Sequence, residues 1–170
     1  MEQSNYENYP LWIVLISNFF SLAVYLLGTF VMYQLGLAWL VAYLAYVACL
    51  EFRLLKGSCV NCYYYGRTCA FGKGRLSCLL FKKGDARKFA CRQITWKDIL
   101  PDFLVSLVPM AAGVILLVHE FSWLVLGAIL LLAVLSFAGS AFVRGSLACK
   151  YCKQRELGCP AERLFGKTKK

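Results

Sequence analysis

The 170-residue sequence contains a single histidine, four prolines and only nine acidic residues. The histidine, His119, is next to Glu120 in the sequence. The sequence offers neither a serine–histidine–acid set nor a pair of carboxylates on the inner side of the predicted membrane. Hydrolytic chemistry that depends on such a set is therefore not expected. Charged residues are also missing from the middle of every long apolar stretch, which argues against a proton relay or a charge-lined ion pathway.

Hydrophobic residues make up 60% of the chain and charged residues only 16%, with a mean hydropathy of +0.60. A soluble domain is typically about 45–50% apolar and about 25% charged. Four apolar stretches stand out, at residues 11–33, 35–50, 103–118 and 121–143. The two longer ones each span roughly 34 Å as a helix, enough to cross a hydrocarbon core of about 30 Å, and flanking apolar residues extend the two shorter ones.

We therefore predict an all-α integral membrane protein with four transmembrane helices, arranged as two tandem hairpins. Each hairpin has a tight turn and is followed by a cysteine-rich segment. The predicted divisions are an N-terminal tail (1–10), a first hairpin (11–55), a basic loop (56–98), a second hairpin (99–143) and a basic tail (144–170).

Lysine and arginine are confined to two segments of the chain. Eleven of the 19 fall in residues 51–102 and eight in residues 144–170, with none in the N-terminal tail or the two turns. Because positively charged segments remain in the cytoplasm, we expect both segments and both termini to be cytoplasmic, in a protein of the cell membrane. Topology and contact with anionic lipid headgroups account for the net charge of +10, so we expect no nucleic-acid partner.

Four local features predict structure within these spans or beside them. Pro109 interrupts the third span, and we expect its freed carbonyl to be satisfied by a hydroxyl or a neighbouring helix. Thr95 followed by Asp98 predicts a helix N-cap. Glu51 is expected to reach outward to the membrane interface, and the short apolar run 76–81, bounded by cations, predicts an interfacial helix.

The cysteines are repeated with one spacing. Two triplets read C-x2-C-x6-C, and each lies just after a predicted hairpin: Cys59, Cys62 and Cys69 in the loop, and Cys149, Cys152 and Cys159 in the tail. The repetition indicates a tandem duplication of one unit, consisting of two helices, a basic exit and a cysteine triplet. Cys49, within the second span, is expected to be a small packing residue.

Cytoplasmic thiols stay reduced, so a metal site is the favoured interpretation of the triplets. Soft thiolate ligands select zinc, Cu(I) or iron–sulfur clusters, and zinc is the expected metal. A tetrahedral zinc site needs four ligands. Cys78 and Cys91 in the loop bring the total to eight, which is enough for two four-sulfur sites.

The triplet spacing is similar to that of the binuclear zinc-cluster module, in which six cysteines hold two zincs with two shared sulfurs. That resemblance implies a shared cluster as a second solution. It covers the triplets alone, because 79 residues separate Cys69 from Cys149, and the DNA-binding role of the module is not carried over.

The function expected from these features is a membrane scaffold whose cytoplasmic zinc site binds a partner protein or lipid headgroups. Two alternatives remain open. The first is a redox or electron-transfer component, using iron–sulfur clusters, to which the pair Cys159-Pro160 points weakly, or reactive C-x2-C thiols. The second is a soft-metal transporter, although no ladder of cysteine or histidine crosses the predicted spans.

Overall fold

The computed structural model describes residues 5–91 and 95–160, and the described chain is helical. The elements in order are α1 (Leu11–Leu35), α2 (Leu37–Gly57), the 3-10 turn η1 (Cys59–Asn61), α3 (Lys73–Leu80), α4 (Ala86–Cys91), α5 (Trp96–His119), α6 (Trp123–Val134), the π-helical turn η2 (Leu135–Gly139), α7 (Ser140–Phe142), the π-helical turn η3 (Val143–Ala148) and α8 (Lys153–Glu156). From α6 to η3 the helix is continuous, with two π-helical turns inserted.

Four helices are long and apolar enough to cross a membrane: Leu11–Leu35, Leu37–Asn61, Lys97–His119 and Trp123–Ala148. The predicted all-helical class and the number of membrane-length helices are therefore confirmed. The two stretches that looked short in the sequence reach 25 and 23 residues, because their polar flanks continue the helix. The Thr95–Asp98 capping box predicted from the sequence is also present at the start of α5.

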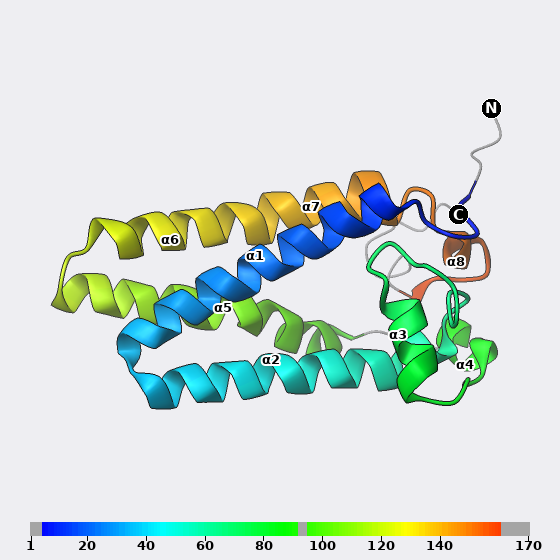
Figure 1. The fold of residues 1–170 in the computed structure, drawn as a ribbon, viewed down its shortest axis with the longest axis horizontal. Helices are drawn as coiled ribbons and strands as arrows, with labels where there is room; N and C mark the ends of the chain where they lie inside the picture. Colours follow the sequence, from blue (N-terminus) through cyan, green and yellow to red (C-terminus); the bar gives the residue numbers. More distant parts are fainter. Residues whose placement is uncertain (1–4, 92–94, 161–170) are drawn as a thin grey trace.

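The helices form an elongated bundle (Figure 1). α1 crosses the bundle diagonally and packs chiefly against α5, with further contacts to α2 and α6. The turn from α1 to α2 passes through Gly36, whose φ of 122° suits glycine. That turn and the turn between α5 and α6 lie at one end of the bundle, while α3, α4 and α8 lie at the other.

Most of the bundle surface is apolar. Exposed fractions reach 75% for Leu11, 81% for Val118 and 75% for Leu124. A soluble monomer rarely presents a continuous apolar surface of this kind, whereas a bilayer covers it. Cys49 also lies on this exposed surface, so the expectation that it packs inside the protein is wrong.

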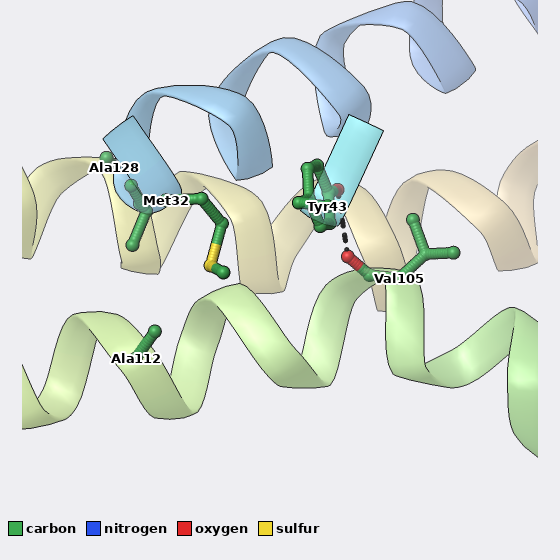
Figure 2. Packing of buried hydrophobic residues seen from close by; sticks show 6 residues of the cluster. Met32, Tyr43, Val105, Ala112 and Ala128 are labelled. Atoms are coloured by element: carbon green, nitrogen blue, oxygen red, sulfur yellow. Dashed lines mark hydrogen bonds between the residues drawn. The ribbon is translucent and has the colours of Figure 1, made fainter. Parts of the chain in front are cut away.

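The centre of the bundle is built where α1, α2, α5 and α6 meet. Its buried residues are Val31, Met32, Tyr43, Val105, Ala112 and Ala128. The Tyr43 hydroxyl donates a hydrogen bond to the Val105 carbonyl over 3.0 Å (Figure 2). Val105 precedes the buried Pro109 by four residues, so its carbonyl has no N–H donor within α5. The predicted satisfaction of this carbonyl by a hydroxyl from a neighbouring helix is confirmed.

Replacing Tyr43 with phenylalanine is expected to destabilise the bundle by about 1 kcal/mol, because the Val105 carbonyl loses its donor in an apolar interior. Thermal unfolding in detergent, followed by circular dichroism, measures the loss. Tyr33→Phe is the matched control, since Tyr33 is 60% exposed. Equal midpoints for the two variants would show that the hydrogen bond does not stabilise α5.

Candidate metal centre

One end of the bundle carries a small folded layer, which we call the cap: residues 5–10, 58–91 and 149–160. The N-terminal segment joins its two other parts. The Tyr6 N–H donates to the Tyr151 carbonyl over 3.1 Å, and the Tyr9 N–H donates to the Thr68 carbonyl over 2.9 Å. Segments from the beginning, middle and end of the sequence are therefore hydrogen-bonded into one unit.

Tyr64 lies at the centre of the cap. Its hydroxyl donates to the Tyr6 carbonyl over 2.6 Å and accepts from the Lys153 N–H over 3.0 Å. Gln154 makes a parallel link, because its buried side-chain oxygen accepts from the Tyr63 N–H over 2.7 Å. These contacts fix the tail against the first cysteine loop.

The two cysteine triplets meet in this layer. A buried cluster of Tyr9, Ile13, Tyr64, Ala70 and Ala148 forms the floor of the cap, and three cysteines pack against it: Cys62, Cys69 and Cys152. The sulfur of Cys62 is within electrostatic range of Cys69 in its own triplet and of Cys152 and Cys159 in the other. Cys59 interacts in the same way with Cys62 and Cys69, and Cys152 with Cys149 and Cys159.

The second cysteine of each triplet has the same local environment. The Cys62 sulfur accepts a hydrogen bond from the backbone N–H of Tyr64, two residues further along. The Cys152 sulfur accepts from the N–H groups of Gln154 and Arg155, two and three residues further along. Backbone N–H donors aimed at sulfur stabilise a thiolate, so the repeated spacing corresponds to a repeated geometry.

Burial is the largest influence on the acidity of these thiols. It raises the pKa of Cys62 to about 11, against the opposing effect of the Tyr64 N–H, and the neighbouring sulfur of Cys152 raises the pKa further. Burial also raises the pKa of Cys152. A thiol that is protonated at neutral pH is a poor nucleophile, which weighs against reactive C-x2-C chemistry at these two residues.

The eight predicted ligands differ in their surroundings. Cys59, Cys62, Cys69, Cys152 and Cys159 are partly buried, and Cys149 is exposed. Cys78, on α3, and Cys91, at the end of α4, are exposed as well, and the Cys78 side chain is hydrogen-bonded to Tyr65. The interactions that define the cluster are thus those among the six triplet cysteines.

In the described residues, the cysteine sulfurs are not arranged as the ligands of one metal ion. Within residues 5–91 and 95–160, no three Cys, His, Asp or Glu side chains are close enough together to hold a metal ion. That part of the chain includes all nine cysteines and contains no disulfide.

No protein-family model, curated protein or solved structure matches this chain. Its function is therefore inferred from the geometry of the cap and the chemistry of its side chains.

Sequence reasoning missed the part that the N-terminal segment plays in the cap. The Tyr6 ring packs at a tilt against Tyr151, and the Tyr9 ring against Tyr64, at ring-centroid distances of 5.3 and 5.6 Å. The sequence signal for these contacts was that tyrosines are concentrated in the same segments as the cysteine triplets. Which tyrosine rings contact each other depends on how distant segments pack, and no local pattern encodes that packing.

Proposed function

We propose that this protein is a small polytopic membrane protein whose two cysteine triplets bind a soft metal ion, zinc above all, and so join the two halves of the chain. The observation that supports the proposal best is the meeting of Cys62 and Cys152 on one buried tyrosine cluster. The two residues are 90 positions apart in the sequence, and they occupy equivalent places in two copies of the same motif.

The donor set suits a soft metal. Six thiols lie in the two triplets, and thiolate ligands favour zinc, Cu(I) or iron–sulfur clusters over magnesium or calcium. N–H groups already directed at the Cys62 and Cys152 sulfurs would help to hold them as thiolates. Loading a metal requires side-chain movements that draw the sulfurs together, and structural zinc binds strongly enough to drive such movements.

The metal would act as a clamp. The tail reaches the first cysteine loop through a few hydrogen bonds, such as those to Tyr64 and Gln154. A metal shared between the triplets adds a strong connection across the same boundary. The clamped cap then offers a fixed surface to a partner protein or to lipid headgroups, which is the scaffold function expected from the sequence.

A redox function is the second candidate. Iron–sulfur clusters use the same thiolates, so the donor set alone does not separate them from zinc. Burial raises the pKa of Cys62 and Cys152 and so disfavours free reactive thiolates at these two positions, and a bound metal would have to displace their protons. A soft-metal transporter has less support, because the only cysteine inside the apolar part of a span, Cys49, lies on the outer surface of α2.

The proposed orientation places the cap in the cytoplasm and the two turns outside the cell, with the two hairpins as tandem repeats. The exposed thiols of Cys78 and Cys91 test it. A membrane-impermeant maleimide should leave both unlabelled in intact cells and label them in inverted vesicles. Labelling of intact cells would place the cap outside.

Metal analysis of protein purified in detergent without oxygen tests the centre itself. We expect a colourless protein that contains zinc, and that loses thermal stability when a strong chelator removes the zinc. A brown protein that contains iron and sulfide would support the redox function instead. Protein that contains no metal, and gains no stability from added zinc, would contradict both.

A further inference from the structure

A groove at the edge of the cap joins the apolar surface of the bundle to a partly buried ion pair between Lys73 and Glu51. It has a volume of about 640 Å³ and lies between α1, the end of α2 and the start of α3. Its sides are apolar, formed by Leu15, Phe19 and Leu22 of α1 and by Leu76 of α3. These leucines and the phenylalanine are also exposed on the outer surface of the bundle, so the groove opens sideways toward the bilayer.

The inner end of the groove is polar. The Tyr25 hydroxyl donates to Glu51 Oε1 over 2.6 Å, and the Lys73 ammonium lies 2.6 Å from Glu51 Oε2 and 2.8 Å from Oε1. The sequence predicts that Glu51 can reach to the membrane interface, and this stays a prediction. Its carboxylate is satisfied by Tyr25 of α1 and Lys73 of α3.

The groove therefore has the two properties that a lipid-like ligand needs, an apolar channel and a cationic group, the Lys73 ammonium paired with Glu51, at its end. The ammonium of Lys73 has three N–H donors, and in the described residues its contacts are with the two oxygens of Glu51. One donor remains for a ligand. Gly72 and Lys73 also begin α3, so the backbone N–H groups of its first turn lie near the same place.

α3 contains most of the short apolar run that the sequence predicts to lie at the level of lipid headgroups. Leu79 and Leu80 on this helix are 81% and 57% exposed, as expected for an amphipathic helix lying in the interface. The cationic residues of the chain are concentrated on the same side of the predicted membrane. An interfacial α3 brings Lys73, which lines the groove, to the level of lipid phosphates.

We propose that this groove binds one anionic phospholipid, with an acyl chain along Leu15, Phe19 and Leu22 and its phosphate at Lys73. None of the residues that line the groove is a predicted metal ligand, although Lys73 and Glu51 are close enough to Cys59 to interact with it electrostatically.

Native mass spectrometry of the full-length protein in detergent tests the site. The probes are phosphatidylglycerol and phosphatidylcholine with identical acyl chains. We expect one phosphatidylglycerol to be retained per chain, at least about tenfold more tightly than phosphatidylcholine, because a charge-assisted contact is lost with the neutral headgroup. Equal retention of the two lipids would overturn the proposal.

Three variants locate the binding. Lys73→Gln should weaken phosphatidylglycerol binding about tenfold, whereas Lys82→Gln, which removes an exposed cation elsewhere in the loop, should not. Glu51→Gln keeps Lys73 and removes its competing anion, so it should strengthen binding, which a purely structural ion pair would not do. An unchanged affinity in both Lys73→Gln and Glu51→Gln would overturn the proposal.

A bulky side chain tests the apolar part of the groove. Leu22→Trp should abolish retention of phosphatidylglycerol by filling the channel, while Leu124→Trp, on the exposed surface of α6, should leave it unchanged. Retention of the lipid by Leu22→Trp would place the lipid elsewhere. A dimer in the wild-type spectrum that disappears in Leu22→Trp would show that a second copy of the chain fills the groove, and this too would overturn the proposal.

Discussion

Replacing Cys62 with serine is expected to lower the metal content of the purified protein at least about tenfold. Loss of an outer group around a metal ligand typically costs about 10–100-fold in affinity, and loss of a ligand costs more. Cys62 has sulfur neighbours in both triplets, so its removal should also detach the tail from the loop. Bound zinc and the thermal unfolding midpoint in detergent are the two measurements.

Cys152→Ser should have the same effect, because it is the equivalent residue of the second triplet. If both sulfurs hold one ion, the double variant should be little worse than either single one, as expected for residues that act together. Cys49→Ser and Cys91→Ser are the controls and should keep the metal. A Cys62→Ser protein with normal zinc content, or two single variants whose losses simply add, would contradict a centre shared between the triplets.

Gly74→Ala is expected to destabilise the protein by about 2–3 kcal/mol through overpacking. A methyl group at Gly74 would lie 2.1 Å from the Tyr64 carbonyl oxygen and 2.5 Å from the Arg67 carbonyl oxygen. Both atoms belong to backbone that cannot move without disrupting the cap, so α3 must lift away. Thermal unfolding measures the loss, and zinc retention shows whether the first cysteine loop is disturbed with it.

Gly127→Ala is the matched control, since a methyl group at Gly127 in α6 would meet nothing within 4 Å. Its stability should be unchanged or raised by up to about 1 kcal/mol, because alanine favours a helix over glycine. The two substitutions are chemically identical and differ only in their surroundings. Equal unfolding midpoints would show that α3 is not tightly docked on the loop.

The sequence predicted the helical bundle well because its signal is local. The stretches that became α1, α2, α5 and the helix beginning with α6 are recognisable by length and composition, whatever they contact. The effect of Pro109 was also predictable from local sequence. A proline removes one N–H from a helix, and in an apolar interior the carbonyl left without a donor needs another one. Here the Val105 carbonyl accepts a hydrogen bond from the Tyr43 hydroxyl.

For the thiol centre, the sequence predicted which cysteines form a repeated motif but not how the two copies contact each other. Equal spacing in the two triplets indicated that Cys62 and Cys152 serve one purpose, and the structure places them on the same tyrosine cluster. The binding of zinc, and the use of six or eight sulfurs, stay predictions. The contribution of Tyr6 and Tyr9 was not foreseeable, since their hydrogen bonds join residues more than 50 positions apart.

The sequence by itself determined the helical class, the four membrane-length segments and the confinement of cations and triplet cysteines to the same two segments. These follow from hydropathy, charge and spacing, which act over short distances along the chain. Only the tertiary structure decided that Glu51 pairs with Tyr25 and Lys73, that α1 packs chiefly against α5, and that the N-terminal segment completes the cap. The physical reason is the same in each case. A buried polar group takes whichever partner the packing brings within reach, and that partner is set by the whole fold.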